Sequence, residues 1–358
     1  MYFKKSGNSC RDRISHSHYL SFFHFLWMLS PAFWAFFFLL LPAGCSSTIT
    51  TDLALPPAID RDAGHFPGPS TGNTFLDILT FDDDRLSRLD SYQRISDFNG
   101  DIAYVESTNG AKIIFVCHGG CADRLDWAGI NSYSALGQMR CRIENESRET
   151  PTRTGECRKS ENDTEGQIRL RPVTSQVCIN TISCDFSGTP YAGRQITHVK
   201  AYLINVCGTS GLMDNGRNTT EYLINHGRLH EEDLMRFTDP GLVFSEIADM
   251  MGTGVLRPDI HFRCLPNRGS EGSPSNPPTR LVIEGKIDGI TYYWPINIGT
   301  GDESGEIYTI DRGSMYSYDI LIRRKGTSDP DTPICILNNE IQLDIEPWTE
   351  KKDYGIQF

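Results

Sequence analysis

A stretch near the start of the chain has residue types that could support hydrolysis. Residues 112–120 (KIIFVCHGG) form an apolar run that ends in His-Gly-Gly, as in the oxyanion-hole loop of lipases and esterases. That chemistry also needs a serine nucleophile in a Gly-x-Ser-x-Gly turn. The sequence has no such turn, and residues 208–211 (GTSG) are one residue short of it. We interpret residues 112–120 as a strand followed by a glycine turn and expect no catalytic residues.

Two groups of side chains carry donor atoms that metals use. Cys117, His118 and Cys121 offer sulfur and nitrogen, but adjacent residues of a strand point to opposite faces. His226 and His230 are four residues apart, yet a glycine interrupts the helix that would bring them together. Three successive aspartates at 82–84 lack the spacing of a calcium loop. We therefore expect no metal site, and the absence of P-loop and dinucleotide motifs gives no reason to expect a cofactor.

Length and charge narrow the classes of function. The chain has 358 residues, enough for two ordinary domains. Acidic residues outnumber basic ones, 46 to 34, and the basic residues near the amino terminus leave the remainder more acidic still. Such a body is repelled by phosphate backbones, so nucleic acid is not an expected partner.

The amino terminus has the features of an export signal. A basic segment precedes 23 uncharged, mostly apolar residues at 19–41, and residues 41–45 (LPAGC) follow. This end resembles the lipobox of bacterial lipoproteins, in which the cysteine thiol receives a diacylglyceryl group and cleavage occurs just before it. The resemblance makes Cys45 the lipidation site, with acyl chains such as palmitate holding the protein on a membrane. Pro42 departs from the usual leucine, and an uncleaved membrane anchor is the alternative.

Nine further cysteines follow the signal. An exported protein lives where disulfides persist, so we expect some pairs, although an odd number cannot all pair within one chain. Their spacing does not define the pairing, and several lie in apolar runs typical of buried thiols. They are Cys117, Cys121, Cys141, Cys157, Cys178, Cys184, Cys207, Cys264 and Cys335.

After a Pro/Gly-rich tether at 46–73, which holds a short candidate strand near 51–55, the pattern is mainly that of β-structure. Asp288-Gly289 between two apolar runs predicts a hairpin with a type I′ turn. Period-two alternation predicts strands at 316–322 and 341–348, each with one buried and one wet face. Residues 229–237 and 242–251 look helical, whereas 146–166 and 267–279 look like loops. Other expected strands are 74–81, 90–95, 102–106, 112–117, 177–186 and 197–206.

Many short strands, frequent turns and few helices predict an all-β fold of two tandem β-sandwich domains. We place a signal peptide at 1–45, the tether at 46–73, an N-terminal sandwich at 74–187 and a C-terminal sandwich at 188–358.

A set of short segments, in a fixed order over residues 74–358, connects the chain to a known family. They are 76–78 (LDI), 81–84 (FDDD), 88–94 (RLDSYQR), 184–188 (CDFSG), 201–206 (AYLINV), 281–285 (LVIEG), 292–296 (YYWPI), 316–320 (YSYDI), Gly326, 329–331 (DPD) and 346–348 (EPW). In these segments the chain resembles the fimbrillin-like fimbrial subunits of Bacteroidales, specifically their minor and anchoring proteins. Residues 311–313 (DRG) depart from the family, which usually has Arg-Asn there, and the nine cysteines are unusual for it.

The resemblance implies transthyretin-like Greek-key sandwiches and assembly by strand donation, in which a strand of one subunit fills a groove in its neighbour. The terminal strand is the candidate donor, through Ile341, Leu343, Ile345 and Trp348, and a permanent edge strand is the alternative. Stalk subunits of the family lose an amino-terminal strand to an arginine-specific protease, whereas anchor subunits keep it. Arg61 is the candidate cleavage residue, flanked by acidic residues that disfavour cutting, and we favour an anchor or minor subunit.

The sequence thus predicts a structural, non-enzymatic fimbrial lipoprotein, exposed on the outer membrane through lipid on Cys45, with other fimbrial subunits as partners. The alternative is a surface lipoprotein that binds a glycan or host protein, with Trp127, Tyr292 and Trp294 stacking on the ligand. For Tyr292 and Trp294 the sandwich core is the competing interpretation.

Overall fold

The structure of the protein is a computed structural model, which describes residues 49–54, 75–96, 98, 102–163, 165–213, 220–334, 346–347 and 354–358. Ser46–Phe358 form one compact unit. Among the described residues, no helix is both long and apolar enough to cross a membrane. Several predicted functional residues lie outside the described ranges: Cys45, Arg61, Ile341, Leu343, Ile345 and Trp348.

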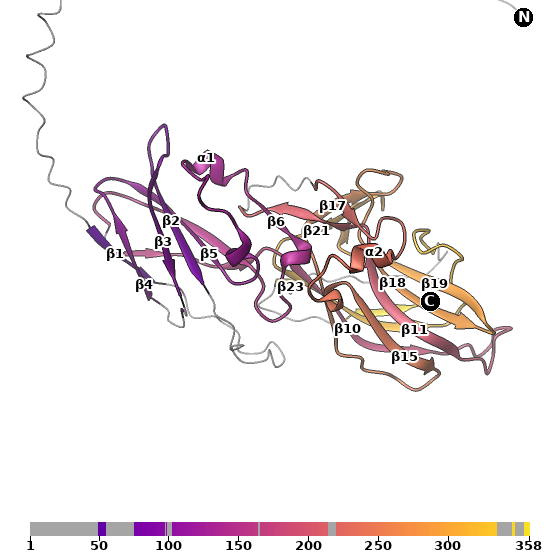
Figure 1. Ribbon diagram of the computed structural model, residues 1–358. Helices are drawn as coiled ribbons and strands as arrows, with labels where there is room; N and C mark the ends of the chain where they lie inside the picture. Colours follow the sequence, from indigo (N-terminus) through magenta and orange to yellow (C-terminus); the bar gives the residue numbers. More distant parts are fainter. Residues whose placement is uncertain are drawn as a thin grey trace, which may run out of the picture. The chain divides into compact units, whose positions relative to one another are not determined.

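The N-terminal sandwich consists of a five-stranded and a three-stranded sheet (Figure 1). The first is antiparallel, in the order β3 (Leu89–Ile95), β2 (Leu76–Asp82), β5 (Lys112–His118), β7 (Arg153–Lys159) and β9 (Arg171–Pro172). The second has the order β4 (Ile102–Ser107), β1 (Ile49–Ala54) and β8 (Glu165–Gln167). Side chains from both sheets form one buried cluster: Leu76, Ile78, Ala103, Val105, Ile114, Val116 and Ile168.

The C-terminal sandwich also has two main sheets, whose inner faces share one hydrophobic core. The first contains β16 (Ile260–Cys264), β10 (Ser175–Cys184) and β22 (Ser314–Ile322), with β23 (Glu346–Pro347) and β24 (Tyr354–Gln357) along the edge of β22. The second is antiparallel, in the order β15 (Phe244–Met251), β11 (Ile196–Ile204), β18 (Arg280–Ile287) and β19 (Ile290–Asn297).

Small elements connect these sheets. The short strands are β6 (Arg140–Arg142), β12 (Val206–Cys207), β13 (Thr209–Gly211), β14 (Leu223–Ile224), β17 (Asn267–Ser270), β20 (Thr300–Gly301) and β21 (Ile307–Ile310). The helices are α1 (Tyr133–Leu136) and α2 (Glu231–Leu234), with 3-10 turns at η1 (Ala122–Arg124), η2 (Ile143–Asn145) and η3 (Pro240–Leu242). The all-β prediction with a few short helices is therefore confirmed.

The Asp288-Gly289 hairpin is confirmed. Ile287 pairs with Ile290, and both turn residues have positive φ, +50° and +83°, as a type I′ turn requires. The alternation predicted for β22 is confirmed on its inner face. The other face is not uniformly wet, because Ser317 there is fully buried.

Four local predictions were wrong. Within the predicted helix at 242–251, Phe244–Met251 form strand β15, because the long neighbouring strand β11 supplies backbone partners that outweigh helix propensity. Only Glu231–Leu234 of the predicted helix at 229–237 is helical. The two segments predicted as loops, 146–166 and 267–279, contain strands β7, β8 and β17. These strands are polar, so their sequences lack the apolar alternation that predicts a strand. β7 is a strand because it pairs with β5, and β17 is a strand because it pairs with β21.

Strand pairing bears on the domain boundary. β10 hydrogen-bonds to β16 and β22, so it belongs to the C-terminal sandwich although it ends before residue 187. The pairing favours a boundary between β9 and β10, and the division into two domains remains a proposal. Arg312 connects the sandwiches at this point. It is 8% exposed, and its guanidinium donates to the carbonyls of Pro172 (3.2 Å) and Leu212 (2.8 Å) and to Thr154 Oγ1.

Candidate assembly interface

Strand β1 is the central strand of its sheet and is distant in sequence from both neighbours. It pairs antiparallel with β4 over six residues, from Ile49↔Ser107 to Ala54↔Ile102. On its other edge it pairs parallel with β8, through three residue pairs. β4 and β8 are joined only through β1. Removing β1 would therefore leave a groove lined by backbone donors and acceptors from both strands.

The floor of that position is apolar. Ala103 and Val105 of β4 are 2% and 1% exposed, and Ile168, next to β8, is fully buried. They pack against the inner face of the five-stranded sheet. A strand in the β1 position therefore completes a hydrophobic core as well as a hydrogen-bond ladder, the two features by which sheets recognise an added strand.

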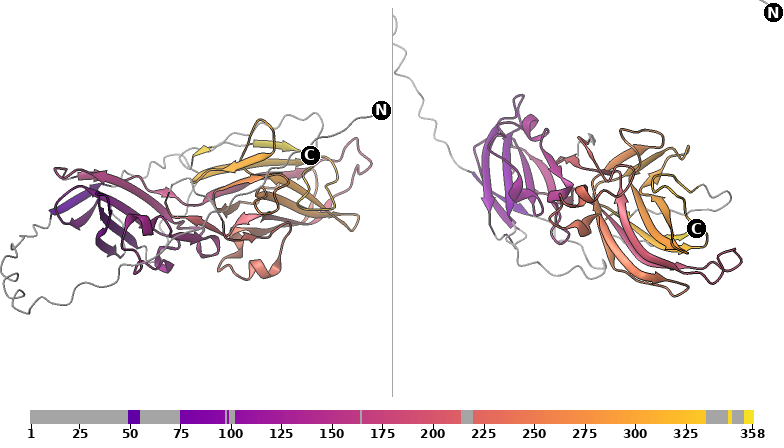
Figure 2. Two further views of the ribbon diagram at one scale, coloured as in Figure 1. Left: turned by 90° about the horizontal axis from the view of Figure 1, so that it is seen from above. Right: turned by 45° about the vertical axis from the view of Figure 1, so that its right-hand side comes forward.

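The C-terminal strands cover a second edge. β23 pairs antiparallel with the start of β22, and β24 pairs parallel with its later part, from Tyr318↔Tyr354 to Leu321↔Gln357 (Figure 2). Ile356 and Phe358 are 4% and 6% exposed within the core of the sandwich. The backbone N–H of Phe358 donates to Leu321 O at 2.7 Å. The predicted donor residues are not described, but these neighbouring strands show that the terminal region supplies edge strands.

A polar cluster holds the segment that precedes these strands. Arg280 is 2% exposed and donates to the Asp331 carboxylate and to Glu271 Oε2 (2.5 Å). Asn205 Nδ2 donates to the same Asp331 oxygen at 2.8 Å. Asn297 bridges Arg280 and Glu271 with bonds of 2.8 Å each. Asp331 is therefore fixed to β11 and β18, at the end of the sandwich where β18 begins.

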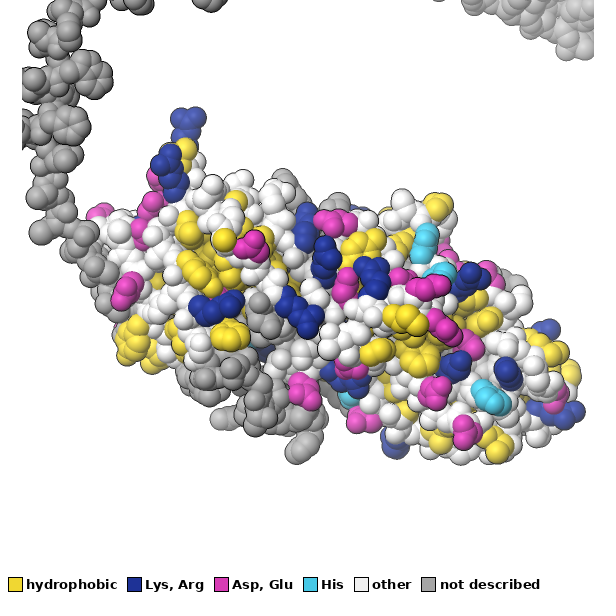
Figure 3. Space-filling model, viewed as in Figure 1, with side chains coloured by type: hydrophobic (Ala, Val, Ile, Leu, Met, Phe, Trp, Pro, Cys, Tyr) yellow, Lys and Arg dark blue, Asp and Glu magenta, His cyan; other side chains and the backbone are white. Residues whose placement is uncertain are grey.

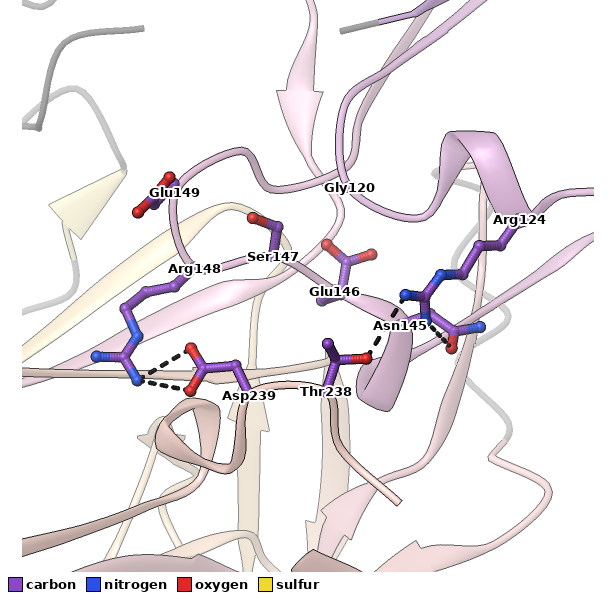
Figure 4. A pocket seen from close by; sticks show the side chains of 9 residues that line it. All are labelled: Gly120, Arg124, Asn145, Glu146, Ser147, Arg148, Glu149, Thr238 and Asp239. Carbon is purple, nitrogen blue, oxygen red and sulfur yellow. Dashed lines mark hydrogen bonds and ion pairs between the residues drawn. The ribbon is translucent and has the colours of Figure 1, made fainter. Parts of the chain in front are cut away.

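A polar cavity of about 490 Å³ lies between residues 120–149 and residues 238–239 (Figure 4). Arg148 Nη2 and Asp239 Oδ2 form an ion pair of 3.1 Å across it, and both side chains are 45% exposed. Glu146 in its wall accepts hydrogen bonds from the backbone and hydroxyl of Thr152, and burial raises the pKa of this carboxyl. None of the residues that line the cavity is aromatic. Arg124 on the same wall donates to Asn145 Oδ1 at 2.9 Å, so Arg148 and Asp239 are the two charged lining residues that an ion pair joins.

Three residues meet the distances of a Cys-His-Asp triad, which the sequence analysis missed. Cys178 Sγ lies 3.1 Å from His261 Nδ1, and His261 Nε2 lies 3.0 Å from Asp259 Oδ1. Gln176 Nε2 lies closer to His261 Nδ1, at 2.7 Å, and Cys178 is 2% exposed. A catalytic thiol must reach its substrate, so we interpret this as a structural hydrogen-bond cluster. Pairing of β10 with β16 creates it, and no sequence motif signals that pairing.

The residues that the sequence analysis considered for catalysis or metal binding make ordinary structural contacts. Burial, together with the charge of Arg153, lowers the pKa of His118. His230 Nε2 lies 3.1 Å from the backbone oxygen of His226, so the two rings do not converge. Asp84 accepts hydrogen bonds from the backbone of Leu86 and Ser87 within one turn. Within the described part of the chain, no group of three His, Cys, Asp or Glu residues is placed to hold a metal ion.

None of the eight described cysteines after residue 45 forms a disulfide, so the disulfides expected from the sequence are not found among them. Burial raises the pKa of most of these thiols, for example that of Cys157 to about 11. The aromatic side chains proposed to stack on a ligand pack inside the protein or against one another. Trp294 is fully buried and donates its indole N–H to Arg324 O at 2.9 Å, and Trp127 is 8% exposed. Tyr292 packs against Trp294, with ring centroids 6.5 Å apart.

No protein-family model and no curated protein sequence matches the chain. Solved structures do match. A proposed cell adhesion protein from Parabacteroides distasonis has a TM-score of 0.57 and 15% identity, covering 84% of this chain and 95% of its own. One from Bacteroides eggerthii has a TM-score of 0.57 and 15% identity, covering 87% and 97%. A fimbrilin from Porphyromonas gingivalis has a TM-score of 0.55 and 12% identity, covering 86% and 96%. The chain shares the fold of these proteins over nearly their whole length.

Proposed function

We propose that the protein is a structural subunit of a cell-surface fimbria, without enzymatic activity. Its fold is that of a fimbrilin and of proposed cell adhesion proteins, although the low identity extends the likeness to fold alone. The short segments quoted from residues 74–358 point to the same family. The burial of Cys178 argues against a catalytic role for its thiol.

The observation that carries this proposal is the position of β1. It is a short strand, distant in sequence from β4 and β8, and it alone connects them. A groove of this kind can accept a strand from another subunit once its own strand has gone. The sheet order supports assembly by strand donation, with β1 as the resident strand and the C-terminal region as the donor.

We place the subunit at the outer membrane, held by lipid on Cys45. The lipobox-like sequence and the tether that follows it support this location. An anchor or minor subunit fits best, because acidic residues on both sides of Arg61 disfavour cleavage and would leave β1 in place. Its partners are other fimbrial subunits, which would receive its terminal strand.

Mass spectrometry of the protein extracted from native membranes tests this assignment. A mature chain that starts at acylated Cys45 and retains residues 46–61 is the expected result. A start at Asp62 would make the protein a polymerising stalk or tip subunit instead. A chain that still begins at Met1 would overturn the lipoprotein assignment and the location with it.

A further inference from the structure

Three exposed hydrophobic side chains lie at one end of the C-terminal sandwich, two on the edge strands β15 and β19 of one sheet and one on the loop after β15. Met250, Val255 and Ile290 are 54%, 60% and 60% exposed. Met250 stands at the end of β15 and Ile290 at the start of β19, and Figure 1 shows both strand ends turned to the same side. Val255 precedes Leu256, which bridges to Ile182 near the end of β10. We call these three residues the distal rim.

Charged groups surround the distal rim. Arg194 and Asp288 form an ion pair of 3.1 Å on the loops beside it, with side chains 58% and 51% exposed. Figure 3 shows hydrophobic, basic and acidic side chains side by side at this end of the molecule. Apolar side chains with a polar border are the composition of protein–protein interfaces.

The C-terminal strand β24 finishes at the same end of the sandwich as the distal rim. β24 runs parallel to β22, so it finishes beside Leu321, near the end of that strand. The segment before the terminal strands is fixed at Asp331, at the opposite end of the sandwich, by Arg280 and Asn205. At least 27 residues follow Asp331, and an extended chain of that length spans about 90 Å. A strand released from β22 can therefore reach beyond the distal rim while Asp331 stays attached.

We propose that the distal rim is the docking surface for the body of the neighbouring fimbrial subunit that accepts the C-terminal strand. This inference rests on the proposed function, because strand donation brings the neighbour to this end. The rim contacts the groove-bearing sandwich of that neighbour through apolar side chains, and the Arg194–Asp288 pair lies at the border. The donated strand supplies most of the affinity, and the rim fixes the orientation of the two bodies.

The test uses two copies of this chain. The acceptor is the mature chain cut after position 61, with Asp60 and Asp62 replaced by Ala so that an arginine-specific protease cleaves after Arg61, and the donor is the intact mature chain. Dimer formation is measured by sedimentation. A donor carrying Met250→Gln, Val255→Thr and Ile290→Thr is expected to bind about tenfold more weakly, the loss of roughly 1.4 kcal/mol of interface contacts. The matched control is Met235→Gln, which changes a side chain that is 81% exposed but lies outside the rim.

A second donor, truncated after Ile334, separates strand donation from docking at the distal rim. If this truncated donor fails to dimerise while the rim variant dimerises like the unmodified chain, strand donation stands and the docking surface is overturned. If truncation changes nothing, or the unmodified pair does not dimerise, strand donation itself fails. Circular dichroism of each variant verifies that the fold is intact, as expected for substitutions at exposed sites.

Discussion

The strands at the two ends of the compact unit occupy different positions in their sheets. β1 is a central strand with neighbours on both edges, whereas β23 and β24 lie on one edge of β22. Loss of a central strand leaves a sheet split in two, with part of the hydrophobic core uncovered. Loss of an edge strand leaves the remaining sheet continuous. Loss of the amino-terminal strand would therefore divide its sheet, whereas loss of the carboxyl-terminal strands would keep the sheet whole but withdraw Ile356 and Phe358 from the core.

The strongest test of this difference is removal of β1. Cleavage after Arg61 with release of the fragment is expected to lower the free energy of unfolding by about 5 kcal/mol or more, a large share of a domain's stability. Denaturant titration measures the loss, and a peptide of residues 46–61 should restore it. An Arg61→Ala chain exposed to the same protease is the control. Unchanged stability after complete release of β1 would contradict the central role of this strand.

Substitution of Arg312 tests whether the two sandwiches unfold in one cooperative transition. Arg312→Met removes the guanidinium donor of the Pro172 carbonyl and one of the two donors of the Leu212 carbonyl, which keeps its bond from Thr154 Oγ1, at an expected cost of about 2–4 kcal/mol. Calorimetry should show the transition of the parent chain separating into two. Arg158→Met is the matched control, because Arg158 is 63% exposed in its pair with Asp83 and its loss should cost less than about 1 kcal/mol. An unaltered thermogram for Arg312→Met would exclude this coupling.

Substitution of Asp331 tests how firmly the carboxyl-terminal strands are held. Asp331→Asn weakens the ion pair with buried Arg280, which we expect to cost about 1–3 kcal/mol. Hydrogen exchange should accelerate in β24 and stay unchanged in β1. Asp288→Asn, at an exposed pair, should leave both strands as they are. Equal acceleration in β1 and β24 would show that the two ends are not independent.

The smallest effect concerns pH. Burial raises the pKa of Asp90, but hydrogen bonds from Thr108 and the charge of Lys112 outweigh it, so this pKa lies below its ordinary value of 3.8. A carboxyl whose folded pKa is depressed stabilises the fold above its unfolded pKa. That contribution is lost as pH falls through the folded value. The N-terminal sandwich should therefore weaken below pH 3.8, by less than about 1 kcal/mol. In acid titrations Asp90→Asn should flatten this part of the profile, and an unchanged slope would count against it.

Local signals in the sequence predicted much of the fold. The Asp288-Gly289 turn and the alternating tyrosines of β22 each depend on residues close together in the chain, and both are confirmed. β15 was mistaken for a helix because its conformation depends on β11, some 40 residues away. The insertion of β1 between β4 and β8 depends on still more distant partners. So does the contact between Asp331 and Arg280, since nothing in the 329–331 segment or around Arg280 indicates which residue the other will meet. The candidate assembly interface was thus the part least visible in the sequence.

The parallel pairing of β22 with β10 has a consequence for biogenesis. Thr181 pairs with Asp319, and β24 then adds to the other side of β22. Contacts between segments so far apart in sequence form slowly. The first sheet of the C-terminal sandwich cannot be completed until almost all of this chain has been synthesised. During synthesis, the emerging amino-terminal part can fold early, while the later part stays open to chaperones until its last strands arrive.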